Sequence, residues 1–274
     1  MSVINTNIKS LISQSALARN ARDVSHAMEQ LSTGKRINSA ADDAAGLAIS
    51  NKMTAQIRGL DQAVRNANDG ISMLQTAEGA TQEVTNMLQR MRELAIQAAN
   101  DTYSDEDRTA LNKEMVQLEE EITRIATNTK WNNMSILSSD GVEKTLQVGI
   151  ANNQDSTILV SFMDMSASGL DIVGLSVEDH SNSQTSLDKI DLAIAEVDAF
   201  RADLGAKINR LNFAGDNLTN ISINTSASRS RIQDADYAKA SSELARTQII
   251  QQAATAILAQ ANTDQQSVLK LLQG

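Results

Sequence analysis

The complete absence of proline is the feature that most constrains this chain, because no residue removes a backbone donor or forces a helix to kink. A chain of 274 residues with this composition can therefore run in long, uninterrupted helices. The chain also has only six aromatic residues, so any core must be built from Leu, Ile, Val, Met and Ala. Narrow aliphatic seams favour helix-on-helix packing over a thick sheet core.

Apolar residues recur in alternating steps of three and four along the first third of the chain, which is the spacing of a coiled-coil seam. The pattern predicts one helix over about 44–100, which would be roughly 85 Å long at 1.5 Å per residue. Its seam positions are Met53, Ile57, Leu60, Val64, Ala67, Ile71 and Leu74 and, after a phase slip at Ala77, Thr81, Val84, Leu88, Met91, Ala95 and Ala98.

Two further helices are predicted from the same kind of pattern. Ser104, followed by three acidic residues, has the form of a helix N-cap, and the seam that starts at Leu111 continues to Ile125. A third seam runs over 187–218, interrupted at Arg201 and Gly215. The short turn before Ser104 predicts that the first two helices are antiparallel neighbours.

The middle of the chain, residues 131–185, is richer in Gly, Ser, Asn and Asp. Two segments rich in β-branched residues, 144–150 and 157–161, flank a polar loop and predict a β-hairpin. The predicted fold is therefore mainly α: an elongated antiparallel helical hairpin or coiled-coil bundle with a small β-hairpin in the middle.

The two ends, about 1–42 and 230–274, carry sparse apolar residues in stripes. Neither end alone buries enough area to offset its ordering entropy, so we expect both to be disordered in the monomer and to order only with partners. The residues predicted to mediate this assembly are Ile232, Leu244, Ile250, Ile257, Leu258, Val268, Leu271 and Leu272.

Composition argues against several functions. The net charge of -10 disfavours nucleic acid as a partner. There is no cysteine, and the two histidines, His26 and His180, lie in no ligand-like cluster, so we expect no catalytic, cofactor or metal site. No apolar run predicts a signal peptide or a membrane span.

Several long runs resemble bacterial flagellins. In the N-terminal half they are LSTGKRINSA at 31–40, DDAAGLAI at 42–49, QIRGL at 56–60, RNANDGI at 65–71 and QTAEG at 75–79. In the C-terminal half they are SRIQDADY at 230–237, QIIQQA at 248–253, LAQAN at 258–262 and VLKLL at 268–272. The chain departs from the family at Trp131-Asn-Asn133, where Phe-Asn-Gly is usual, and it lacks the large outer variable domains.

The resemblance implies a structural subunit that self-assembles into the extracellular flagellar filament used for motility, and not an enzyme. It implies an N-terminal inner-core segment over 1–42 that pairs with the C-terminus. It also implies a helical outer-core domain over 43–229 and a C-terminal inner-core helix over 230–274. Export through the flagellar type III apparatus, an export chaperone, and cap and junction proteins belong to the same expectation.

The segment at 88–100, LQRMRELAIQAAN, is similar to the flagellin segment read by the flagellin-sensing Toll-like receptor of vertebrates. This resemblance implies receptor contacts at Gln89, Arg90, Leu94 and Glu114. Since Leu88, Met91 and Ala95 occupy the seam, we expect Arg90 and Leu94 to point outward. The alternative is that the same residues serve only subunit packing.

Two other functions compete with that of filament subunit. A hook-filament junction protein shares the terminal pattern but should not self-propagate. A coiled-coil adaptor or signalling protein would explain the heptads but not the paired terminal signatures.

Overall fold

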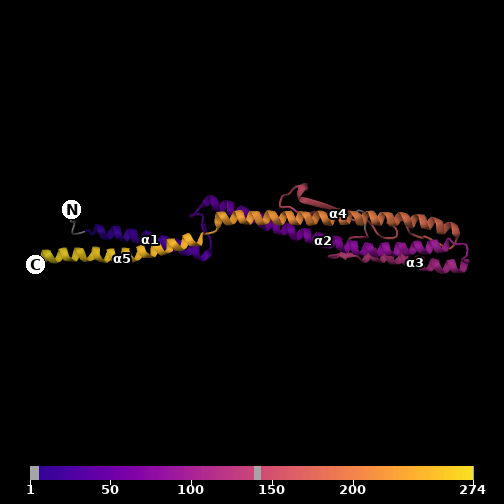
Figure 1. The fold of residues 1–274 in the computed structure, drawn as a ribbon, viewed down its shortest axis with the longest axis horizontal. Coiled ribbons are helices and arrows are strands. Elements are labelled where there is room, and N and C mark those ends of the chain that lie inside the picture. The colour runs from indigo at the N-terminus through magenta and orange to yellow at the C-terminus, as the bar shows by residue number, and fades with distance from the viewer. Residues whose placement is uncertain (1–5, 139–142, 274) are drawn as a thin grey trace. The chain divides into compact units, whose positions relative to one another are not determined.

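The computed structural model describes the backbone of residues 6–138 and 143–273, and the side chains of 6–138 and 143–263. Its helices are α1 (Ile8–Thr33), α2 (Ala44–Ala98), α3 (Asp105–Asn128), α4 (His180–Gln233) and α5 (Tyr237–Gln273) (Figure 1). The strands are β1 (Lys130–Trp131), β2 (Met134–Ser135), β3 (Glu143–Gln147) and β4 (Thr157–Ser161), with a 3-10 turn η1 (Gln154–Ser156) before β4. The mainly α prediction is confirmed.

Contacts within the chain divide it into two compact units. Unit 1 comprises Met1–Gln56 and Asn224–Gly274, and unit 2 comprises Ile57–Ile223. The helices α2 and α4 each contribute residues to both units. The units are described separately below.

Unit 2 is built on the predicted seams. In α2, Leu74, Leu88 and Met91 are fully buried, and α2 ends at Ala98, within two residues of the predicted end. Helices α3 and α4 flank α2, since Arg90 of α2 pairs with Glu114 of α3 and Arg92 pairs with Asp191 of α4, and both run antiparallel to it (Figure 1). The core residues from α3 and α4 that meet this face are Met115, Ile122, Ile190, Val197, Leu204 and Leu211.

The turn between α2 and α3 is fixed by a capping box. The hydroxyl of Ser104 accepts a hydrogen bond from the backbone N–H of Asp107 at 3.2 Å, and the carboxylate of Asp107 accepts one from the backbone N–H of Ser104 at 3.1 Å. The Ser104 hydroxyl also donates to the Asp107 carboxylate at 2.7 Å; this hydrogen bond and, to a smaller extent, the one from the Ser104 backbone N–H lower the pKa of Asp107. The predicted N-cap is therefore correct.

The hairpin of β3 and β4 is antiparallel, with Glu143 opposite Ser161 and Gln147 opposite Thr157. Its first strand ends at Gln147, earlier than predicted, and the Gln147 side chain donates to the carbonyls of Gly149 and Ala151 just beyond it. The hairpin lies against α2, where Gly70 makes room for it. A Cβ added at Gly70 would lie 2.6 Å from Cδ1 of Leu146.

A second, smaller hairpin of β1 and β2 was not predicted. Its turn residues, Asn132 and Asn133, have φ values of 48° and 62°. Both therefore lie in the left-handed region, which the two-residue hairpin turn of this type requires and which asparagine tolerates. The departure at Trp131-Asn-Asn133 thus retains a tight turn.

The segment after β4, for which the sequence pattern predicted no helix or strand, contributes to the core. Phe162, Met165 and Ile172 are buried in the main apolar cluster of unit 2. Helix α3 holds the segment, since the Glu119 carboxylate accepts from the N–H of Gly174 and the Asn112 side chain accepts from that of Val177. The third helix also begins earlier than predicted, at His180, and continues to Gln233.

In unit 1, α1 lies beside α5 (Figure 1). The chain segments that enter and leave this pair bond to one another near Gly34. Gly34 ends α1 with a φ of 68°, and its carbonyl accepts from the N–H of Ala235 at 2.9 Å. The N–H of Arg36 donates to the carbonyl of Gln233 at 2.7 Å.

We predict that Ser104→Ala lowers the free energy of unfolding by about 1 kcal/mol at neutral pH, the usual cost of losing a serine N-cap. The pKa of Asp107 in the folded protein lies below its unfolded value. The contribution of this carboxylate to the free energy of unfolding is therefore fully present above pH 3.8. That contribution is lost as the pH falls through the lowered folded value. Urea unfolding of both proteins at pH 7 and in acid measures this, and an equal difference at both pH values would contradict the assignment.

Candidate functional site

The α1 and α5 pair is held together mainly by small and polar groups. The side-chain amide of Asn20 is buried and donates to the carbonyl of Thr247 at 2.8 Å, and that of Asn7 donates to the carbonyl of Ala261 at 3.0 Å. The described residues that this pair buries are Ser10, Asn20, Ala27, Ala240, Thr247 and Ala261. No large aliphatic side chain is among them, so the pair gains little from apolar burial.

Many of the large aliphatic residues of the same two helices lie instead on the surface. Ile12 of α1 is 65% exposed, and Ile250 and Ile257 of α5 are 41% and 59% exposed. The others with exposed side chains are Ile8, Leu11, Met28 and Ile249. A surface with this many exposed aliphatic residues marks an interaction site in a soluble protein.

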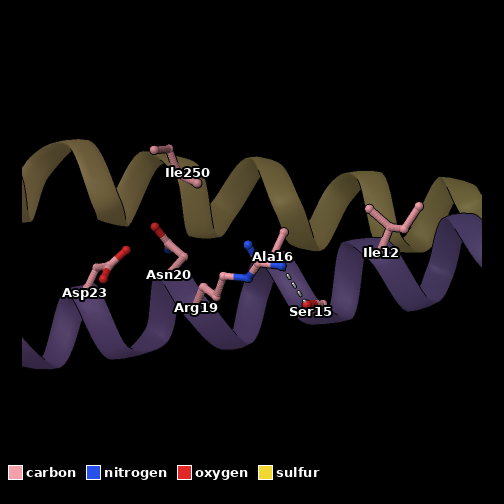
Figure 2. A pocket seen from close by; sticks show the side chains of 7 residues that line it. All are labelled: Ile12, Ser15, Ala16, Arg19, Asn20, Asp23 and Ile250. Carbon is pink, nitrogen blue, oxygen red and sulfur yellow. Dashed lines mark hydrogen bonds between the residues drawn. The ribbon is translucent and has the colours of Figure 1, made fainter.

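A shallow groove runs between the two helices at this surface. One section has a volume of about 460 Å³. In Figure 2, Ile12 of α1 and Ile250 of α5 lie at its two ends, and the Asn20 side chain points from α1 towards α5 near Ile250. Arg19 and Asp23 also line this section. A neighbouring section of about 420 Å³ is also lined by Ile12, and by Ile257 of α5. The groove is an apolar strip with a few polar groups, which suits another amphipathic helix.

The residues predicted for assembly have different environments. Ile250 and Ile257 are exposed, whereas Ile232, Leu244 and Leu258 are partly buried. The side chains of the remaining three, Val268, Leu271 and Leu272, lie outside the described residues. The exposed residues of α1 were not predicted, although Ile8, Leu11 and Ile12 have the i, i+3, i+4 spacing that signals one helix face.

A second candidate surface lies on unit 2 around Arg90. Its guanidinium donates to Glu114 on α3 and to Glu93 one turn along α2, both at 2.9 Å. The hydrogen bond to Glu114, followed by that to Glu93, raises the pKa of Arg90. Gln89, Arg90 and Glu114 are exposed, and the ion pair brings Arg90 and Glu114 together. Gln89 lines a shallow hollow with Asp191 and Ile194 of α4.

The prediction that Leu94 points outward is wrong. Its side chain is 0% exposed and belongs to the main apolar cluster of unit 2. The heptad argument assigned a single seam to α2, but α2 packs against both α3 and α4, so its buried face is wider than one seam. Because its side chain is buried, Leu94 cannot contact a receptor directly.

Metal binding and membrane insertion depend on the arrangement of acidic side chains and on the apolarity of the helices. Over the described residues no three His, Asp or Glu side chains converge on a point where a metal ion could bind. In the same part of the chain, no helix combines the length and the apolarity needed to cross a membrane.

The fold and the terminal groove define a class of protein: a mainly helical protein whose two terminal helices pair and leave aliphatic side chains exposed along a groove. The family model for the bacterial flagellin N-terminal helical region matches residues 4–141, and that for the C-terminal helical region matches residues 187–272. The chain belongs to the bacterial flagellin family. It is a subunit of the extracellular flagellar filament, a helical polymer, and it is a structural protein and not an enzyme.

Individual relatives agree with this assignment. A flagellin of Halalkalibacterium halodurans is 46% identical over 271 residues, which cover 99% of this chain and 100% of the relative. The flagellar filament 33 kDa core protein of Treponema phagedenis is 40% identical over 99% of this chain and 100% of its own length. A putative flagellar hook-associated protein from Vibrio parahaemolyticus shares the fold, with a TM-score of 0.59 and 14% identity over 70% of this chain and 100% of that one.

We predict that a protease acting on the monomer cuts within α1 and α5 before it cuts within α2, α3 and unit 2's part of α4. The terminal pair buries few large side chains, so its local opening should cost little free energy. Mass spectrometry of the fragments identifies the surviving core, which should correspond closely to unit 2. Equal resistance of both units would contradict the prediction.

Proposed function

We propose that this flagellin polymerises by burying the exposed apolar surface of α1 and α5 against the same helices of other copies. The observation that carries the proposal is the exposure of Ile12, Ile250 and Ile257 along one groove. Covering such side chains contributes about 25 cal/mol per Å² of apolar area removed from water. Many copies in a helical array would give each pair the apolar neighbours that it lacks alone.

The exposed surface of α1 and α5 also has a consequence for the subunit before it is exported. In a cell, an exposed apolar groove promotes premature polymerisation, so an export chaperone that covers α5 would keep the chain monomeric. We propose that the subunit then leaves through the flagellar type III apparatus and meets the junction and cap proteins at the growing filament. The support for this route is membership of the family and the exposed terminal surface.

The assembly proposal is tested by Ile250→Asp with Gln251→Asp as its matched control. Both variants add one negative charge to exposed positions of α5, but only Ile250 lines the groove. A carboxylate buried in an apolar interface is strongly unfavourable, so Ile250→Asp should abolish seeded growth, whereas Gln251→Asp should polymerise normally. Circular dichroism should show equal helicity in both monomers.

Light scattering after addition of short filament seeds measures this growth, and electron microscopy identifies the product. Filaments from Ile250→Asp at the wild-type rate would exclude this groove as an assembly interface. The assay also separates the filament subunit from a junction protein, which would add to seeds but would not continue to elongate them.

We further propose that the surface formed by Gln89, Arg90 and Glu114 is recognised by the flagellin-sensing Toll-like receptor. The support is the similarity of residues 88–100 to the segment that this receptor reads, together with the exposure of the three side chains. The two ion pairs of Arg90 hold its guanidinium in one position, which reduces the entropy lost on binding. Arginine is also enriched among residues that dominate binding energy.

We predict that Arg90→Ala weakens receptor binding roughly 30-fold or more, as loss of a dominant interface residue does. Glu114→Ala should weaken it less, because Arg90 would remain but lose its position. Arg124→Ala is a matched control, since Arg124 is an exposed arginine paired with Glu121 on α3. Receptor binding and reporter activation by monomers of equal helicity measure the effect. If Arg90→Ala and Glu114→Ala both kept wild-type potency, the proposal would be rejected, and these residues would serve only subunit packing.

A further inference from the structure

Helices α4 and α5 are separated by a short break, although the sequence there contains no residue that stops a helix. Helix α4 ends at Gln233 and α5 begins at Tyr237. The segment between them, Asp-Ala-Asp, has neither proline nor glycine, and alanine is the best helix former. By backbone propensity alone, α4 could continue into α5 as one helix. The cause of the break therefore lies in contacts from elsewhere in the chain.

Residues 34–36, which we call the clip, supply these contacts. Lys35 of the clip pairs with Asp234 in an antiparallel β-bridge, across some 200 residues of sequence. The carbonyl of Gly34 accepts a hydrogen bond from the N–H of Ala235 at 2.9 Å. The clip thus takes up backbone groups of the break that a helix would use internally.

Arg36 makes two contacts with the end of α4. Its N–H donates to the carbonyl of Gln233 at 2.7 Å, and its guanidinium donates to the carbonyl of Ile232 at 2.6 Å. Carbonyls in the last turn of a helix lack donors of their own and carry the negative end of the helix dipole, so a cationic donor suits them. The carboxylate of Asp43 lies 3.9 Å from the same guanidinium. Arg36 therefore caps the C-terminus of α4.

The clip and a continuous helix compete for the same backbone groups. In an α-helix the N–H of Ala235 would donate to the carbonyl of Arg231. The carbonyl of Gln233 would likewise accept from the N–H of Tyr237. Because the N–H of Ala235 carries one hydrogen, it cannot serve the carbonyls of Arg231 and Gly34 together. Pairing with the clip interrupts the helix, and loss of the clip would let α4 run into α5.

Gly34 lets the chain leave α1 in the direction that the clip needs. Its φ of 68° lies in the left-handed region, which glycine adopts readily and alanine only with strain. A Cβ added at Gly34 would meet no atom within 4 Å. A substitution here therefore changes the preference of the backbone without disturbing any packing.

The clip also bears on the register in which α5 pairs with α1. In the observed register the side-chain amide of Asn20 donates to the carbonyl of Thr247. Small residues recur every seven positions along this face of α5, at Ala240, Thr247 and Ala254. A shift of α5 by seven residues would again place a small residue and a backbone carbonyl opposite Asn20. Packing within the pair thus discriminates weakly between these registers, whereas the clip ties the end of α1 to the start of α5.

We propose that the clip ends α4 and fixes the register of the α1 and α5 pair, with Arg36 as its positioning side chain. The register decides which aliphatic side chains share the terminal groove, where Ile12 and Ile257 line one section. In this consequence for assembly the proposal rests on the proposed function. The register itself is a property of one chain, so it can be measured without polymerisation.

Disulfide trapping in the full-length monomer measures the register, because the chain has no cysteine of its own. Ala27→Cys with Ala240→Cys reports the observed register, since these buried residues lie one heptad from Asn20 and Thr247 respectively. Ala27→Cys with Thr247→Cys reports a shift of seven residues. In dilute monomers under catalysed oxidation, the first pair should form its disulfide faster than the second, by about tenfold or more.

Both cysteine pairs are then combined with variants of the clip. Gly34→Ala should lower the ratio of the two rates roughly tenfold, the effect of placing alanine in the left-handed region. Gly34→Asn is the matched control and should keep the ratio, because asparagine tolerates this region. Arg36→Ala should lower the ratio roughly fivefold, as loss of one hydrogen bond does. Lys35→Ala removes the same charge from the neighbouring position and should have little effect.

An unchanged ratio in Gly34→Ala would overturn the proposal, and an unchanged ratio in Arg36→Ala would overturn the role of its side chain. Chemical shifts of the Cα atoms of residues 234–236, measured by NMR, provide a second readout. They should be non-helical in the wild type and helical in Gly34→Ala. Non-helical shifts in Gly34→Ala would show that the break is intrinsic to residues 234–236, which would also overturn the proposal.

Seeded polymerisation of Gly34→Ala separates the clip from the proposed function. If the register ratio falls and seeded growth is impaired, both proposals are supported. If the ratio falls while growth stays at the wild-type rate, the clip is retained and assembly through the terminal groove is rejected.

Discussion

Burial of the apolar face of α2 between α3 and α4 is the interaction on which the rest of unit 2 depends. Leu74, Leu88, Met91 and Leu94 are removed from solvent entirely. With no proline to interrupt them, these helices can present their seams over many turns. The hairpin of β3 and β4 then packs on the surface of α2, where Gly70 lets Leu146 of β3 come close to the helix backbone.

If the seam between α2 and α4 held only aliphatic residues, one helix could shift along the other by a heptad and still bury them. One polar layer in the seam disfavours such a shift. Arg201 interrupts the α4 seam, and its guanidinium contacts Gln82 and Glu78 on α2 while its Nε is buried without a hydrogen-bond partner. A slip of seven residues would carry Arg201 towards Leu74 or Leu88 and remove those contacts. We interpret this layer as a device that specifies register at some cost in stability, as single polar residues do in coiled coils.

The sequence was sufficient to predict features that repeat over many residues, namely the α2 seam, the Ser104 cap and the β3–β4 hairpin. It was insufficient where a side chain's environment depends on a second neighbour. Leu94 was placed outside because one seam was assumed, and residues 162–178 were not recognised as core because an irregular segment has no period to detect. The β1–β2 turn was missed because Asn132 and Asn133 adopt a conformation that many asparagine pairs do not. The exposed residues of α1 had detectable spacing, but periodicity alone does not say which face of a helix the monomer covers.

The two units thus differ in what stabilises them: unit 2 encloses its own aliphatic core, whereas α1 and α5 leave many of their large aliphatic side chains exposed. Hydrogen exchange measured on monomers and on filaments of the same protein tests this difference most directly. The account predicts that backbone amides of α1 and α5 exchange rapidly in the monomer and become protected in the filament, while those of α2 and α3 within unit 2 are protected in both. Protection of α1 and α5 in the monomer equal to that in the filament would contradict it.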